Sequence, residues 1–320
     1  MEDIVVISDK QVMSRSEKIV YKWDEIDWRK LERSVFKLQK RIYQASKSGD
    51  WKRMKRLQKL LLKSKSAKLL AVRRVTQVNK GKKTAGIDGL KSLSPTQRLK
   101  LARRLKLRDK SKPVRRIWIP KPGKTEKRPL GIPTMADRAK QALVKLVLEP
   151  EWEAKFAPNT YGFRPARSCH DAIEAIYKAI NRKNAYVLDA DLKSCFDNID
   201  HIALLNKLNT FPKLRRVIKG WLRNGVMEGE VFYKTKAGTP QGGVISPLLA
   251  NIALYGLEYE LKEALIKDLR QYAEQKWEVP VSSERAKRNI AIVFYADDFV
   301  IIHESKEIIL KAKENTLKNG

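Results

Sequence analysis

Residues 289–302 read NIAIVFYADDFVII, and this stretch predicts the structural element around which the rest of the chain is arranged. Two apolar runs flank Ala296, Asp297 and Asp298, which is the pattern of a β-hairpin with a tight turn. One aspartate is common in turns, but two adjacent carboxylates at an apolar tip repel each other. A bound cation would relieve this repulsion, so the hairpin predicts a metal site.

A second acidic segment lies earlier in the chain. Residues 184–201, NAYVLDADLKSCFDNIDH, hold four aspartates and one lysine, and they open on an apolar run that predicts a buried strand. In a strand, Asp189 and Asp191 share one face, and either of them can approach the hairpin turn. Converging carboxylates without histidine suit Mg²⁺, which prefers oxygen ligands. Two such ions about 4 Å apart can activate a primer 3′-hydroxyl and stabilise leaving pyrophosphate, which is polymerase chemistry.

The charge of the chain agrees with a nucleic-acid substrate. The 320 residues carry 68 Lys and Arg against 36 Asp and Glu, a formal net charge of +32. Residues 51–83 hold thirteen basic residues and no acid, and residues 97–128 hold fourteen basic residues and two acids. Runs of one sign favour contact with phosphate over a merely solvated surface. An anionic membrane surface is the lesser alternative.

The same counts exclude several classes of protein. Two cysteines, Cys169 and Cys195, with three scattered histidines cannot form a usual zinc site or a disulfide framework. The acidic N-terminal stretch lacks the pattern of a signal peptide, and no apolar run approaches the ~18 residues of a membrane span. We therefore expect an intracellular protein, cytoplasmic or organellar, with no membrane partner.

Periodicity places these segments on elements. Apolar residues at helical spacing predict helices over residues 28–42, from residue 51 onwards, and over residues 137–156 and 168–180. Residues 79–90, NKGKKTAGIDGL, predict a loop. Alternation from Val114 to Trp118, followed by Pro122 and Gly123, predicts a basic β-hairpin.

Five segments carry a resemblance to a known family. Residues 295–298, YADD, resemble the YxDD box of reverse transcriptases, and DADLKSCFDNIDH resembles the first catalytic segment of that family. GTPQGGVISPLLANIAL (238–254) resembles the nucleotide- and template-binding segment, while YGFRPARSCHDAI (161–173) and IPKPGKTEKRPLGIPTMADRAKQA (119–142) resemble the finger segments. Their order is also that of the family. Together with the earlier segment KTAGIDG, the residues of these motifs are most similar to those of group II intron reverse transcriptase/maturases, over about residues 20–303.

The resemblance implies the roles of the acidic residues. The family places its first catalytic aspartate five residues before an aromatic that blocks the sugar 2′ position, which selects Asp191 by its spacing from Phe196. Asp191, Asp297 and Asp298 would then be the catalytic residues and the ligands of two Mg²⁺ ions. Asp189 would be a structural neighbour.

The resemblance also implies contacts with substrates. The implied nucleotide-binding residues are Arg115, Lys121, Arg128, Phe196 and Gln241. The basic side chains among them would neutralise charge on the β- and γ-phosphates of an incoming dNTP. Tyr295 would support the primer end, and Gly242 beside Gln241 would allow a close approach of the backbone to primer and template.

The implied fold is α+β, a right-hand polymerase with an antiparallel palm sheet. A basic helical extension would cover residues 1–78, fingers 79–184 and a palm 185–320, the palm incomplete and without a thumb or a DNA-binding and nuclease region. The implied function is RNA-directed DNA polymerase (reverse transcriptase) with an intron RNA-binding, maturase role. Its partners would be an RNA template, intron RNA, a DNA primer and dNTPs, with a homodimer left open. The alternative is a non-catalytic intron RNA-binding maturase fragment that assists splicing.

Overall fold

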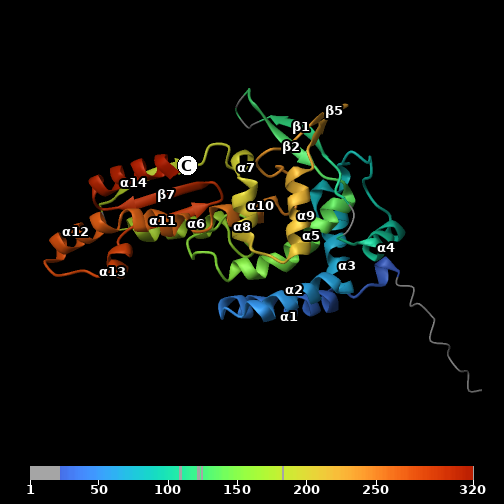
Figure 1. Cartoon of the computed structure of the whole chain (residues 1–320), viewed down its shortest axis with the longest axis horizontal. Helices are drawn as coiled ribbons and strands as arrows, with labels where there is room; N and C mark the ends of the chain where they lie inside the picture. Colours follow the sequence, from blue (N-terminus) through green and yellow to red (C-terminus); the bar gives the residue numbers. More distant parts are fainter. Residues whose placement is uncertain (1–21, 108–109, 121–122, 124, 182–183, 320) are drawn as a thin grey trace, which may run out of the picture.

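A bundle of basic helices opens the part of the chain that the structure describes. The structure is a computed structural model, and it describes residues 22–107, 110–120, 123, 125–181 and 184–319 (Figure 1). The first helices are α1 (Trp28–Lys47), α2 (Trp51–Lys63) and α3 (Lys65–Arg73). Asp27, Asp50 and Ser64 each accept a hydrogen bond from a backbone N–H in the first turn, which fixes where these helices begin.

These helices pack on α5 (Met135–Glu153), which is buried over most of its length. The amphipathic spacing that predicts α1 and α2 turns their apolar sides toward α5, and the lysines and arginines remain outside. The shared core continues into later helices, and its fully buried members include Ile42, Leu61, Val72, Val144, Val147, Leu214 and Ile252. Buried Gln58 donates from Nε2 to Glu151 Oε2 at 2.7 Å, so a polar contact also joins α2 to α5.

The predicted basic hairpin is confirmed, and it forms part of a larger sheet. Strands β1 (Val114–Pro120) and β2 (Lys127–Ile132) pair in antiparallel fashion. A second hairpin, β4 (Val226–Glu228) with β5 (Val231–Tyr233), joins through a parallel pairing of β4 with β1. The order is β2-β1-β4-β5, which no sequence pattern predicted.

A separate three-stranded antiparallel sheet contains both acidic segments. Its order is β3 (Tyr186–Asp191), β7 (Asp298–His303) and β6 (Ala291–Tyr295), so the predicted β6–β7 hairpin is confirmed. The prediction that the first acidic segment opens on a buried strand is wrong. Strand β3 lies at the sheet edge and most of its side chains are half-buried or exposed, because only β7 pairs with it.

Helices cover both faces of this sheet. On one face, Ile292, Phe294, Phe299 and Ile301 belong to a second hydrophobic core with the later helices. On the other face, Val293 packs with Ala172 of α6 (Cys169–Ile180). The helices of the second core include α11 (Leu257–Ala264), α12 (Ile266–Trp277), α13 (Ser283–Lys287) and α14 (Lys306–Asn319). Figure 1 shows the two sheets toward opposite ends of the molecule.

Shorter helices and turns make up the remaining elements of the described residues. They are α4 (Pro95–Arg104), α7 (Cys195–Asn198), α8 (His201–Leu208), α9 (Pro212–Arg223), α10 (Ser246–Leu254) and the 3₁₀ or π turns Trp23–Glu25, Arg74–Val78 and Lys80–Lys83. Helices α8 to α10 contribute to the first core, together with the N-terminal helices. The division into 1–78, 79–184 and 185–320 stays a prediction. Within the described residues, no helix combines the length and the apolar character needed to cross a membrane.

We predict that Leu61→Ala lowers the free energy of unfolding by about 2–5 kcal/mol, because Leu61 of α2 is fully buried in the first hydrophobic core and truncation leaves a cavity. Its neighbour Leu60 is 52% exposed, so Leu60→Ala is a matched control with a change within about 0.5 kcal/mol. Urea denaturation followed by circular dichroism measures both. An equal decrease in the free energy of unfolding of the two variants would contradict the burial of Leu61 in the core.

Candidate active site

The tip of the β6–β7 hairpin carries two of the predicted site residues. Tyr295 pairs with Asp298, so Ala296 and Asp297 form a two-residue turn. Ala296 has φ +60°, a left-handed conformation that costs a non-glycine residue about 1–2 kcal/mol. Strained backbone of this kind is maintained only where the surrounding structure enforces it.

The first acidic segment meets this tip through the register of the sheet. Asp191 lies directly opposite Asp298 on the neighbouring strand, a position in which Cβ atoms are about 4.5–5.5 Å apart. The backbone N–H of Leu192 donates to the Asp297 carbonyl at 3.2 Å. The structure therefore brings Asp191, Asp297 and Asp298 together at one end of the sheet, as the sequence predicts.

Like charges make this end of the sheet unfavourable without a cation. Burial raises the pKa of Asp298 above its ordinary value, and repulsion from Asp297, Asp191 and Asp189 raises it further. The same environment reaches Cys195, whose thiol pKa is raised to about 11 by burial and by the charges of Asp297 and Asp191. For both groups burial is the larger cause of the raised pKa, and the neighbouring carboxylates add to it.

The chemistry of the donors fits a hard divalent cation. Asp191 and Asp298 are exposed and Asp297 is half-buried, so all three carboxylates are reachable from solvent. Among the described residues, no group of three or more His, Cys, Asp or Glu side chains is arranged to hold a metal ion by itself. Mg²⁺ is usually held in proteins by one or two carboxylates, and water and substrate phosphates complete its shell.

Phe196 stands beside the acidic residues on α7, and it is half-buried. Its carbonyl accepts a hydrogen bond from the Thr239 N–H at 2.7 Å. His201 Nε2 lies 2.7 Å from the Gly238 carbonyl, and the Gly238 N–H donates to Ile199 O at 2.9 Å. The loop after β5 therefore holds the segment that carries Phe196.

Gln241 and Gly242 lie where that loop crosses β2. The Gly131 N–H donates to the Gln241 carbonyl at 2.6 Å. Gly242 has φ +105°, and an added Cβ would lie 2.7 Å from Gly131 O, so only glycine fits there. Gln241 lines an open cavity with Gly131, Arg116 and Asp197, so it faces a space shared by the β1–β2 hairpin and α7.

The predicted phosphate-binding residues are less closely grouped. Arg115 on β1 is half-buried, and its Nε has no hydrogen-bond partner, whereas Arg128 on β2 is exposed. Their ladder partners, Ile132 and Ile119, place both arginines on one face of the hairpin, about 13 Å apart along the strands. Lys121 lies outside the described residues.

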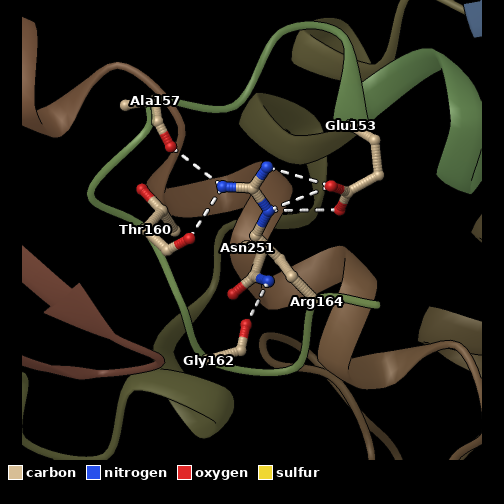
Figure 2. Close-up of polar contacts among 6 residues, drawn as sticks. All are labelled: Glu153, Ala157, Thr160, Gly162, Arg164 and Asn251. Carbon is tan, nitrogen blue, oxygen red and sulfur yellow. Dashed lines mark hydrogen bonds and ion pairs between the residues drawn. The ribbon is translucent and has the colours of Figure 1, made fainter. Parts of the chain in front are cut away.

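Sequence reasoning did not single out several residues that hold this site together. Arg164 and Asn251 lie inside two of the quoted segments, and Glu153 lies near the end of α5. Figure 2 shows their side chains converging on the loop beside the hairpin tip. The sequence does not show that Arg164 is buried, although its partners lie only 4–11 residues away, and the partner of Asn251, Gly162, lies 89 residues away.

Comparison with known proteins agrees with this geometry. A family model of the N-terminal domain of reverse transcriptase matches residues 23–105, and one of reverse transcriptase (RNA-dependent DNA polymerase) matches residues 119–319. Group II intron-encoded protein LtrA of Lactococcus lactis subsp. cremoris is 34% identical over 72% of this chain. Protein YkfC of Escherichia coli (strain K12) is 32% identical over 77%, and maturase-like protein 1 of Euglena gracilis is 32% identical over 57%.

The helical N-terminal region, the antiparallel sheets and the family matches define an α+β polymerase fold with fingers and palm, as predicted. The chain belongs to the reverse transcriptase family, among the group II intron reverse transcriptase/maturases. Members of this family generally use divalent metal ions. The chain spans 46% of the length of LtrA, 71% of YkfC and 41% of the Euglena protein.

We predict that Asp298→Asn raises the thermal midpoint at neutral pH in EDTA. A carboxyl group whose pKa is higher in the folded than in the unfolded chain destabilises the fold once ionised. The increase in the thermal midpoint of Asp298→Asn over wild type is therefore largest above the folded-state pKa of Asp298. It disappears as the pH falls below the pKa of an aspartate in the unfolded chain, ~3.9. Differential scanning fluorimetry between pH 3.5 and pH 8 measures it.

Asp24→Asn is the control, because Asp24 is exposed and remote from the sheet. Added Mg²⁺ should stabilise the wild type more than Asp298→Asn, since binding stabilises the state that binds. A midpoint lower than wild type at neutral pH in EDTA would contradict the proposed charge repulsion.

Proposed function

We propose that this chain catalyses RNA-templated DNA synthesis, transferring a nucleotide from a dNTP to a primer 3′-hydroxyl with two Mg²⁺ ions. The observation that carries the proposal is the sheet register that sets Asp191 opposite Asp298 beside the turn of Asp297. When bound, the ions would activate the 3′-hydroxyl and stabilise the leaving pyrophosphate. Asp191, Asp297 and Asp298 are the proposed ligands.

The surrounding residues have proposed roles that follow from their positions. Phe196, half-buried beside the aspartates, would exclude a ribose 2′-hydroxyl by steric contact. Gln241 and Gly242 would lie against the nucleotide and the template. Arg115, Arg128 and Lys121 would neutralise the triphosphate, and Tyr295, which is exposed at the tip, would support the primer end.

The same proposal includes an RNA partner. Helix α2 exposes Lys52, Arg53, Arg56 and Lys63, and within the described part of the chain none of them forms an ion pair with an acidic residue. Unpaired exposed cations on one helix are suited to RNA phosphates. The relatives named as an intron-encoded protein and a maturase-like protein support intron RNA as that partner. An intracellular location stays a prediction.

This basic surface also favours a second candidate function, an RNA-binding maturase role without polymerisation. The two candidates differ in whether the acidic tip is needed. RNA binding depends on the basic helices, whereas primer extension also depends on the aspartates.

We predict that the purified chain extends oligo(dT) on poly(rA) with dTTP and Mg²⁺, and that Asp297→Asn reduces extension by about a thousandfold or more. The metal ions supply several kcal/mol of transition-state stabilisation that the variant loses. RNA affinity should not fall, because the substitution removes a negative charge. Primer-extension gels and filter binding measure the two quantities.

Asp200→Asn is the matched control for this experiment. Asp200 lies in the same acidic segment, but its carboxylate accepts the Ala203 N–H at 2.6 Å as a helix cap, a role that asparagine also fills. Extension should stay close to wild type. Equal and weak extension by all three proteins, together with tight binding of intron RNA, would favour the binding-only function.

We predict that Phe196→Ala raises incorporation of UTP relative to dTTP by about tenfold or more, because removing the ring opens space for the 2′-hydroxyl. The measurement is the ratio of kcat/KM for the two nucleotides on the same primer and template. Phe36→Ala is the control, since Phe36 is 65% exposed on α1 and remote from the site. An unchanged ratio would remove Phe196 from the proposed sugar selection.

A further inference from the structure

The loop between α5 and α6 is closed into a compact unit by one buried side chain. Arg164 donates from Nη1 to the carbonyls of Ala157 at 2.9 Å and Thr160 at 2.7 Å. Its Nε and Nη2 contact the Glu153 carboxylate at 2.9–3.2 Å. Figure 2 shows the guanidinium lying between the Glu153 carboxylate on one side and the carbonyls of Ala157 and Thr160 on the other. Paired, charge-assisted hydrogen bonds of this kind fix both the distance and the relative orientation of the guanidinium and the carboxylate.

The closed loop is bonded to the strand that leads into the hairpin turn. The Phe294 N–H donates to Asn159 O at 2.9 Å, and the Tyr161 N–H donates to Phe294 O at 2.9 Å. Gly162 then passes so close to the turn that an added Cβ would lie 2.2 Å from Ala296 N. The loop therefore contacts the backbone of the strained residue next to Asp297.

A second buried residue fixes the loop from another direction. Asn251 on α10 donates from Nδ2 to Gly162 O at 2.8 Å, and its side chain is almost fully buried (Figure 2). Three of the quoted sequence segments thus meet at one point: GFRP through Gly162 and Arg164, the PLLANI segment through Asn251, and the YADD box through Ala296.

The next residue of the loop reaches the other side of the site. Phe163 has φ +60°, and its ring makes an edge-on contact with Phe196, with ring centroids 6.1 Å apart at 84°. The loop therefore contacts both the turn that carries Asp297 and the side chain proposed to select the sugar. Phe163 and Ala296 both adopt left-handed backbone conformations, which non-glycine residues keep only where the surrounding structure enforces them.

We propose that residues 157–164 are a positioning element that sets the catalytic turn and Phe196 together, with Arg164 and Asn251 as its positioning residues. The proposal rests on the function proposed above, because it assigns catalytic meaning to the turn and to Phe196. Tightening or loosening one loop would then change the placement of Asp297 and the fit of the sugar at the same time.

Hydrogen exchange without substrate tests the mechanical part. Asn251→Asp keeps the shape of the side chain but places a carboxylate against Gly162 O, and Arg164→Lys keeps the charge but loses the paired hydrogen bonds. In both variants, peptides covering residues 291–303 should exchange about tenfold faster, the effect of one lost hydrogen bond on local opening. Unchanged exchange in both variants at equal temperature would overturn the proposal.

Arg270→Lys is the matched control for these variants. Arg270 also joins a carbonyl and a carboxylate, Val281 O at 3.1 Å and Glu274 at 3.3 Å, but it lies on α12. Exchange should increase near residue 281 and stay unchanged in the hairpin. An equal increase in the hairpin for Arg270→Lys would show general loosening and would overturn the assignment to this loop.

A nucleotide-selection measurement tests the catalytic part. Phe163 is 48% exposed, so Phe163→Leu should fold normally and lower the dTTP over UTP selectivity by about threefold, the value of one aromatic contact, with primer–template affinity within about twofold. An unchanged selectivity overturns the link to Phe196. A wild type that extends no primer overturns the proposed function instead, and the exchange experiment still decides whether the loop braces the hairpin.

Discussion

The antiparallel ladder of β3, β7 and β6 is the constraint on which the site depends. Its register aligns Asp191 with Asp298, and the two-residue turn adds Asp297 at the same end. Backbone hydrogen bonds and two layers of apolar side chains hold these carboxylates together against their repulsion. Burial raises the pKa values of Asp298 and Cys195, and the enforced proximity of the carboxylates raises them further.

The cluster of carboxylates at the hairpin tip contrasts with the basic character of the whole chain. The chain carries a net charge of +32, and three of its 36 acidic residues, Asp191, Asp297 and Asp298, lie together at one end of the sheet. Helix α5 connects these regions. Its buried face supports the N-terminal helices, its Gln141 accepts the Val244 N–H at 2.8 Å, and its Glu153 pairs with Arg164. One helix thus links the basic bundle, the loop of Gln241 and Gly242, and the loop beside the turn of Ala296 and Asp297.

Much of the fold could be predicted locally. The N-terminal helices form over the segments where apolar residues recur at helical spacing, and both predicted hairpins form where apolar runs flank turn residues. The predicted helix over 137–156 is observed as Met135–Glu153, close to its predicted bounds. The failure concerns β3, whose apolar run predicted a buried strand. An apolar run gives no information on how many neighbours a strand will have, and this one has a neighbour on one side only.

The sequence by itself determined the family, the fold class, the charge distribution and the identity of the candidate carboxylates, because these depend on residue types and on their spacing along the chain. Only the tertiary structure decided that Asp191 faces Asp298, that Arg115 and Arg128 lie apart on one face, and that Arg164, Asn251 and Gly162 converge behind the turn. These relations join residues that are distant along the chain, and they are fixed by strand register and by the packing of α5 and α10. Local patterns cannot encode them.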